Sequence, residues 1–342
     1  MRLEVIAFTA KGAALGEKLL DLYPDGALTA PVKFGGERAR PLAQSLSGWA
    51  RDRFQQGNTL VFIGSAGIAV RAIAPFVGSK ATDPAVLCVD EGGGYVIPLL
   101  SGHIGGANRA AGALAGALGA TAVITTATDL RGLFAPDAWA AQNDCAIQNP
   151  AAIKAVSAAL LAGEPVGLRC EFPITGKLPA GLSLGGEAQV GVEIALWGTS
   201  PFPCTLSLIP RVLIAGIGCR KGVPAARIES ALLAGLSRLD LPIQAVGRVA
   251  TIHRKAGEPG LLALCDKLGV RLVSFGPGEL MAVQGDFTPS DRVLRITGAD
   301  NVCERAVACA GGEPLLPKTV LEGVTVALGV MERQISFEEE WD

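Results

Sequence analysis

Several features that would point to other classes of protein are scarce or missing in this sequence. Its 342 residues carry a formal net charge of −2, so no overall basic field favours a nucleic-acid partner. It has only 2 histidines, and no two of its 8 cysteines form a CxxC pair, which argues against a metal site. In a chain this long and apolar, we expect reduced, mostly buried thiols rather than a disulfide framework.

Long apolar runs and a leader segment are also missing. The longest weakly polar run, residues 110–124, contains three glycines and is shorter than the ~20 apolar residues that a membrane span needs. The chain starts Met1-Arg2-Leu3 and enters a predicted strand at once, without a charged-then-apolar signal segment. We therefore expect a cytoplasmic protein that has no membrane partner.

The hydrophobic pattern indicates an α/β fold. Hydrophobic residues make up 49% of the chain but aromatic residues only 5%, so small aliphatic side chains fill the core, as in parallel sheets covered on both faces. Short apolar runs alternate with helical spacing, which predicts βαβ units and a largely parallel sheet. The predicted strands are 3–8, 60–63, 86–89, 95–100, 121–125, 165–170, 211–215, 244–252, 270–275 and 324–330, and the helices include 12–22, 68–74, 107–118, 151–161, 224–236, 259–268 and 301–310.

The chain is predicted to have three parts. An N-terminal parallel-sheet α/β domain spans 1–137, a small middle α/β segment with its linker spans 138–208, and a C-terminal α/β domain spans 209–342. The proline-rich run 200–203 is the expected linker, and residues 176–191, rich in Gly, Pro and Ser, are an expected loop.

The first candidate site is the glycine-rich run Ser101-Gly102-His103-Ile104-Gly105-Gly106-Ala107-Asn108, between a predicted strand and a helix. Glycines let backbone N–H groups approach a ligand, and a helix N-terminus favours a carboxylate or oxyanion. His103 is a candidate general acid or base, at the strand end where open α/β sheets bind ligands. The alternative is a histidine that only holds a turn together.

Other strand ends add candidates to this site. Asp90 and Glu91 end another predicted strand, and either carboxylate could orient His103 or act as a base; the alternative is a solvated pair. Four more side chains at or just after such ends are candidate substrate ligands: Ser65, Arg71, Thr126 and Asp129. For the threonine, the alternative is that it only caps a helix.

The second candidate site is Gly216-Ile217-Gly218-Cys219-Arg220-Lys221-Gly222. Its third glycine comes one place too late for GxGxxG, so a dinucleotide loop is disfavoured. Arg220 and Lys221 instead suit carboxylates. Together with Arg254 and Lys255, which follow His253, they would form a local basic cluster, with ordinary surface charge as the alternative. Cys219 could be reactive beside these cations or could simply pack.

At these residues the chain resembles a known family. The segments 64–71, 82–86, 90–91, 97–108 and 124–129 resemble the N-terminal module of the cobalt-precorrin-5A hydrolase (CbiG) family of anaerobic cobalamin biosynthesis. The segments 216–222, 250–261 and 323–327 resemble its C-terminal module. The resemblance runs in order over nearly the whole chain.

The resemblance implies a hydrolase that opens the δ-lactone of cobalt-precorrin-5A and releases acetaldehyde, which leaves cobalt-precorrin-5B. Cobalt would arrive with this acidic tetrapyrrole substrate, so no cofactor or metal of the protein's own is expected. Other enzymes of the pathway are the candidate protein partners.

On this basis, His103 would be the general base or acid, with Asp90 or Glu91 behind it. The amides of Gly105, Gly106 and Ala107 would hold the oxyanion or a propionate, and Arg220 and Lys221 would hold peripheral carboxylates from across a domain cleft. The full set of candidate substrate ligands is Ser65, Arg71, Ser101, Gly102, Gly105, Gly106, Asn108, Thr126, Asp129, Gly218, Cys219, Arg220, Lys221, His253 and Lys255. Two rival functions stay open: a non-catalytic corrinoid carrier and a nucleotide-dependent oxidoreductase.

Overall fold

The computed structural model describes residues 2–79, 82–103, 105–126 and 133–337. The chain divides into two compact units, Met1–Trp139 (unit 1) and Ala140–Glu338 (unit 2). Both units are α/β with sheets rich in parallel strands, which confirms the predicted fold class. Among the described residues, no helix is both long and apolar enough to span a bilayer.

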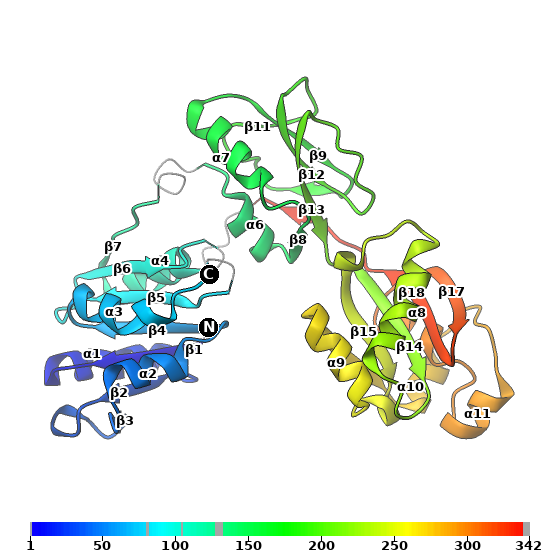
Figure 1. Ribbon diagram of the computed structural model, residues 1–342, viewed down its shortest axis with the longest axis horizontal. Helices are drawn as coiled ribbons and strands as arrows, with labels where there is room; N and C mark the ends of the chain where they lie inside the picture. The colour runs from blue at the N-terminus through cyan, green and yellow to red at the C-terminus, as the bar shows by residue number, and fades with distance from the viewer. Residues whose placement is uncertain (1, 80–81, 104, 127–132, 338–342) are drawn as a thin grey trace. The chain divides into compact units, whose positions relative to one another are not determined.

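Unit 1 is built on one seven-stranded sheet with the strand order β3-β2-β1-β4-β5-β6-β7 (Figure 1). The chain moves outward from β1 to β3 and then returns to the other side of β1 with β4. The first five strands are parallel to one another. The strands are β1 Arg2–Ala7, β2 Ala27–Ala30, β3 Ala39–Pro41, β4 Asn58–Ile63, β5 Ala85–Val89, β6 Tyr95–Leu100 and β7 Thr121–Ala122.

Helices bury both faces of this sheet, which explains the unbroken apolar runs of its strands. Val61 and Ile63 of β4 point to the face covered by α1 and α4, whereas Leu60 and Phe62 point to the face covered by α2 and α3. The glycines of α1 and the alanines of α4 allow close packing on the sheet: a Cβ at Gly16 would lie 2.6 Å from Leu28 of β2. The helical elements are α1 Ala10–Leu22, η1 Val32–Phe34, α2 Leu46–Arg53, α3 Ala66–Ile73, η2 Ala74–Phe76, α4 Ala107–Leu118 and α6 Pro136–Gln142.

Two strands of unit 1, β6 and its parallel neighbour β7, run opposite to the other five. β5 and β6 form an antiparallel hairpin in which Val89 faces Val96 and Val86 faces Leu100. The turn 90–94 closes this hairpin with Gly93 at φ 72°, a conformation that glycine adopts readily. The carboxyl end of β6 therefore lies beside the N-terminal ends of the five parallel strands. The carboxyl ends of those strands are on the opposite side of the sheet, one strand length away.

Unit 2 contains two five-stranded sheets. The first has the order β11-β9-β12-β13-β8, with β8 antiparallel to β13. Part of the expected linker lies in its core: Phe202 is buried, and its ring occupies the space that Cβ atoms would need at Gly167 and Gly191. The elements are β8 Cys145–Ile147, α7 Ala152–Ala162, β9 Val166–Cys170, β11 Leu182–Leu184, β12 Val190–Ile194 and β13 Cys204–Pro210, with a small pair formed by β10 Ile174–Thr175 and β19 Ile335–Ser336.

The second sheet of unit 2 has the order β16-β15-β14-β18-β17, in which β14, β15 and β16 are parallel. Helices α8 and α9 cover one face, and α10 and α12 cover the other. The three-part division at 137 and 208 stays a prediction. The elements are β14 Leu213–Cys219, α8 Ala225–Ser237, η3 Ile243–Ala245, β15 Val246–Ile252, η4 His253–Lys255, α9 Pro259–Leu268, β16 Arg271–Phe275, α10 Pro277–Ala282, α11 Asp291–Thr297, α12 Cys303–Cys309, β17 Glu313–Leu321 and β18 Val324–Val330.

Candidate functional site

The His103 loop folds back on its own backbone before α4 begins. The Ala107 amide donates to the Ser101 carbonyl at 3.0 Å, and the Gly106 amide donates to the His103 carbonyl at 2.9 Å. Gly106 then caps the helix with φ 79°. Two of the three amides expected to hold an oxyanion are thus already bonded within the loop. That expectation fails for Gly106 and Ala107 in this structure, because the tight turn itself consumes their N–H groups.

Ser101 opens this loop in a strained conformation. Its φ of 59° is in the left-handed region that a non-glycine residue rarely adopts. Its hydroxyl is buried and has no hydrogen-bond partner among the described residues. Gly105 packs against it so closely that a Cβ there would lie 2.3 Å from the Ser101 Cβ. A strained residue with an unbonded buried hydroxyl is unusual and marks this turn as a candidate site.

Asn108 ties the loop to the segment after β7. The side-chain amide of Asn108 donates to the Thr126 hydroxyl at 3.0 Å, and Asn108 itself is buried. A Cβ at Gly102 would lie 2.8 Å from the Asn108 side-chain oxygen, so glycine is needed there for this packing. The structure therefore brings Gly102, Asn108 and Thr126 together with His103. Asp129 lies outside the described residues.

The carboxylate that contacts His103 belongs to Asp137, at the start of α6. His103 Nδ1 lies 3.3 Å from Asp137 Oδ1, and the two side chains are only 19% and 10% exposed. Burial raises the pKa of Asp137, but the hydrogen bond and positive charge of His103 outweigh it and hold that pKa below its ordinary value. Sequence reasoning missed Asp137, because no spacing pattern connects it with the loop.

Asp90 and Glu91 lie at the carboxyl ends of the parallel strands, whereas His103 lies near their N-terminal ends. The expectation that one of these carboxylates supports His103 is therefore wrong. The β5–β6 hairpin separates them from His103 by the length of β5, roughly 15 Å at ~3.3 Å per residue. Asp90 accepts hydrogen bonds from the amides of Gly92 and Tyr95, which close the hairpin turn. Glu91 accepts one from the Thr9 hydroxyl.

Ser65 and Arg71 lie at the same end of the parallel strands as Asp90 and Glu91. Ser65 precedes α3 as its N-cap residue, and Arg71 is exposed in the last turn of the same helix. They follow β4, which lies beside β1 at the point where the strand order reverses. This is where open α/β sheets bind ligands. The candidate residues of unit 1 are thus divided between the two ends of the strands of one sheet.

In unit 2 the glycines of the second candidate loop belong to a strand. β14 extends to Cys219, so Gly216 and Gly218 lie inside the sheet. A Cβ at Gly216 would lie 1.9 Å from the Cys303 carbonyl oxygen of α12, and one at Gly218 would lie 2.5 Å from the Thr325 hydroxyl. These glycines are needed for packing, which accounts for the near-match to a dinucleotide motif. The expectation of a ligand loop beginning at Gly216 is wrong.

The turn after β14 is held by a buried carboxylate. Glu258 accepts a hydrogen bond from the Gly222 amide at 2.5 Å and pairs with Lys255 Nζ at 2.8 Å. The bond from Lys255 and then that from Gly222 lower the pKa of Glu258. Lys255 therefore has a structural partner. Burial raises the pKa of the Cys219 thiol despite nearby Lys255, so it is protonated at neutral pH and packs as a thiol.

Three other predicted residues are exposed at the carboxyl ends of β14 and β15: two cations and one histidine. Arg220 and Lys221 follow β14, and His253 follows the neighbouring strand β15. In the described part of unit 2, neither Arg220 nor Lys221 forms a salt bridge with a carboxylate. They have the charge and exposure that binding an acidic ligand requires.

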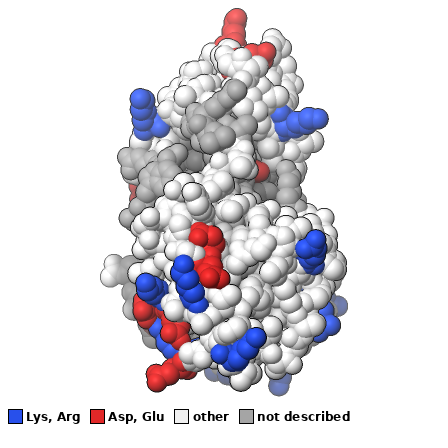
Figure 2. Space-filling model, turned by 90° about the vertical axis from the view of Figure 1, so that its left-hand side faces the viewer, with Lys and Arg blue, Asp and Glu red and all other residues white. Residues whose placement is uncertain are grey.

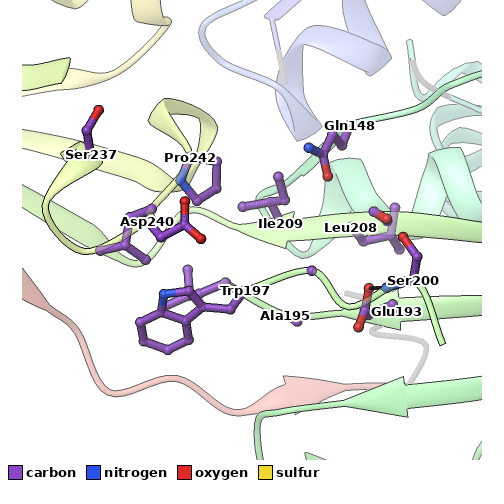
Figure 3. Close-up of a pocket in the computed structure, with 14 residues that line it drawn as sticks. Gln148, Glu193, Ala195, Trp197, Ser200, Leu208, Ile209, Ser237, Asp240 and Pro242 are labelled. Carbon is purple, nitrogen blue, oxygen red and sulfur yellow. Dashed lines mark hydrogen bonds between the residues drawn. The ribbon is translucent and has the colours of Figure 1, made fainter.

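Most of the face shown in Figure 2 is uncharged, and its Lys and Arg side chains are mixed with Asp and Glu side chains. A cavity of about 450 Å³ lies in unit 2 but contains none of the predicted site residues. Figure 3 shows Trp197, Asp240 and the buried Glu193 in its wall. Glu193 is already bonded to the amides of Thr199 and Ser200.

Among the described residues, no group of three or more His, Cys, Asp or Glu side chains is arranged to hold a metal ion.

Comparison with known proteins gives matches along the whole chain. It is 34% identical to the cobalt-precorrin-5A hydrolase of Salmonella typhimurium over 340 residues, which covers 95% of this chain and 97% of the relative. It is 30% identical to the cobalt-precorrin-5A hydrolase of Priestia megaterium, covering 95% and 93%. The chain belongs to the CbiG family.

Three CbiG family profiles divide the chain between them. Residues 48–129 match "Cobalamin synthesis G N-terminal", residues 134–190 match "Cobalamin biosynthesis central region", and residues 213–329 match "Cobalamin synthesis G C-terminus". His103 thus falls in the N-terminal CbiG module, whereas Asp137 falls in the central one. A solved cobalamin biosynthesis protein G homologue from Sulfolobus solfataricus is 22% identical with a TM-score of 0.39, covering 96% of this chain and 97% of its own.

Proposed function

We propose that this CbiG-family chain is a cobalt-precorrin-5A hydrolase. The carrying observation is the match over nearly its full length to two relatives of that name, at 34% and 30% identity. The reaction adds water to the δ-lactone carbonyl and breaks its C–O bond, giving a carboxylic acid and an alcohol. The alcohol then loses its proton as its C–C bond to the macrocycle breaks. Acetaldehyde leaves, and the macrocycle carbon takes up a proton to give cobalt-precorrin-5B.

This chemistry needs a group that moves protons and groups that hold an acidic substrate. His103 is a partly buried imidazole in a loop that opens with the strained Ser101, and the ordinary imidazole pKa of about 6.5 suits acid or base work near neutrality. Ser101, Gly102, Gly105, Asn108 and Thr126 surround or shape that loop. We propose that His103 activates water or the alcohol, and that cobalt arrives with the substrate, so the protein supplies no cofactor of its own.

The exposed cations of unit 2 are proposed to bind substrate carboxylates. Replacing Arg220 and Lys221 together by alanine is expected to raise KM about tenfold while leaving kcat within a factor of about two, since each lost charge-assisted bond contributes about 0.7 kcal/mol at an exposed site. Arg238→Ala, an exposed cation at the C-cap of α8, is the matched control. Equal KM values for the double variant and the control would remove Arg220 and Lys221 from the site.

The function itself is tested by anaerobic incubation of the purified chain with cobalt-precorrin-5A and assay of acetaldehyde. One acetaldehyde per substrate consumed supports the hydrolase. Tight binding of the tetrapyrrole without acetaldehyde would instead establish a carrier. We propose a cytoplasmic enzyme, with other enzymes of the pathway as its candidate partners.

A further inference from the structure

We infer that Asp137 is the positioning residue of the reaction: its carboxylate holds His103 through Nδ1, so that protons are exchanged with water or substrate at Nε2. The reaction in this statement rests on the proposed function, whereas the pairing rests on the geometry alone. Asp137 belongs to the central family module, whereas His103, the one histidine of unit 1, belongs to the N-terminal module.

The Asp137 carboxylate is held in place by a backbone hydrogen bond in addition to its contact with the imidazole. Its Oδ1 accepts a hydrogen bond from the Ala138 amide at 3.0 Å, in the first turn of α6. The same oxygen lies 3.3 Å from His103 Nδ1. On either side of Asp137 in the sequence, the rings of Phe134 and Trp139 lie 5.9 Å apart and are buried, so the start of α6 is anchored by an apolar contact. A carboxylate held in this way can fix the orientation of a ring.

The protonation states follow from the charges. A carboxylate whose pKa is held below its ordinary value is ionised at neutral pH and only accepts hydrogen bonds. Nδ1 of His103 must therefore carry a hydrogen, in both the neutral and the charged ring. The neutral ring then has its lone pair on Nε2, which makes Nε2 the basic atom. By the same coupling, an ionised Asp137 carboxylate favours the charged form of the ring beside it.

Asp83 and Arg109 are further charged residues near the loop in the described part of unit 1. The Asp83 carboxylate accepts from the amides of Gly78 and Ser79, so it is bonded to its own turn. Arg109 of α4 has a guanidinium nitrogen 3.7 Å from the position of a Cβ at Gly106. A positive charge beside an imidazole disfavours its protonated form, which is opposite to the effect of Asp137. The titration below measures the sum of these effects.

The chain offers a direct test because it contains only two histidines. A ¹H–¹⁵N NMR titration of the whole protein reports the tautomer and pKa of each ring, and His253→Gln assigns the signals. We expect neutral His103 to carry its proton on Nδ1. In Asp137→Asn we expect the His103 pKa to fall by about one unit, since an opposite charge at this range shifts a pKa by one to three units. Asp90→Asn should leave the His103 pKa unchanged, as should Asp21→Asn on the surface of α1.

Turnover supplies the second readout. Asp137→Asn should lower kcat for acetaldehyde release about 10- to 100-fold, with KM little changed and the acid limb of the pH profile moved to lower pH. Asp137→Glu, which keeps the charge, should recover part of the loss. Asp21→Asn is the control that keeps full activity.

The outcomes separate the two claims. If the wild-type protein releases no acetaldehyde, the proposed function fails, while the titration still decides the pairing. If acetaldehyde is released but Asp137→Asn keeps the wild-type His103 pKa and kcat, Asp137 has no positioning role. If Asp137→Asn fails to fold, the wild-type spectrum decides: a neutral His103 with its proton on Nε2 would overturn the inference.

Discussion

At the scale of single residues, the turn around Ser101 combines strain with an unbonded polar atom. The left-handed φ of Ser101 and its buried hydroxyl are each unfavourable for stability, by about 1 kcal/mol or more. Such costs persist in proteins mainly where function requires them. Ser101 therefore offers a test of whether the strain is real and whether it serves the reaction.

Ser101→Gly is expected to stabilise the protein by about 1 kcal/mol, because glycine tolerates φ 59° and removes the hydroxyl. Ser101→Ala is the matched control, since it removes the hydroxyl but keeps the strain, and it should be less stable than Ser101→Gly. Thermal unfolding of the three proteins gives the order. A glycine variant less stable than the wild type would contradict the assignment of strain, and unchanged kcat/KM would separate that strain from function.

Residue identity alone gave mixed guidance at the site. His103 stands out as a histidine among glycines, and the structure confirms that its loop lies between a strand and a helix. Asp137 could not be found in this way, because an acid at the start of a helix is usually only a favourable charge there. Asp90 and Glu91 looked equally suitable, and only the direction of β6 excludes them as partners of His103.

At the scale of secondary-structure elements, β14 needs its glycines in order to pack against α12. Gly216→Ala should destabilise the protein by about 3 kcal/mol, because the new Cβ would meet the Cys303 carbonyl, which the helix backbone holds in place. Gly257→Ala is the control, since its Cβ would meet open space, and it should change stability by less than about 0.5 kcal/mol. Urea unfolding compares them, and equal midpoints would show that this packing is misassigned.

The link between the β14 turn and α9 predicts a dependence on pH. Because the folded-state pKa of Glu258 is lower than its ordinary 4.5, its ionised form stabilises the fold above pH 4.5. That contribution is lost as the pH falls below 4.5 through the folded-state pKa. Glu258→Gln should therefore be less stable than the wild type at pH 7, and the difference should shrink on acidification.

Urea midpoints measured between about pH 7 and pH 3 test this dependence. Glu322→Gln, which removes an exposed partner of Arg227, is the control and should show little difference at any pH. A stability gap for Glu258→Gln that stays constant down to pH 3 would argue against a lowered pKa.

At the scale of the whole molecule, alternation of apolar strands and helices was enough to predict the α/β class, because strands buried on both faces read as continuous apolar runs. The same runs do not distinguish parallel from antiparallel neighbours. The three glycines at 92–94 were the available sign of the β5–β6 hairpin. β17 went unpredicted because Pro314 and Pro317 interrupt it, which an edge strand tolerates.

The expected linker at 200–203 shows a second limit of sequence reasoning. Prolines there suggested an exposed connection, yet Phe202 fills the gap left by two glycines on neighbouring strands. Complementarity of this kind between distant residues leaves no local pattern. The family resemblance, by contrast, follows short motifs and is confirmed over nearly the full length.

The central claim is that bonds are broken at the His103 loop. It is tested most directly by single-turnover release of acetaldehyde from cobalt-precorrin-5A by the wild-type protein and by His103→Ala. We predict that the variant still binds the substrate but releases acetaldehyde about 100- to 10,000-fold more slowly, as expected for loss of a general acid or base. Release at the wild-type rate by folded His103→Ala would contradict the account.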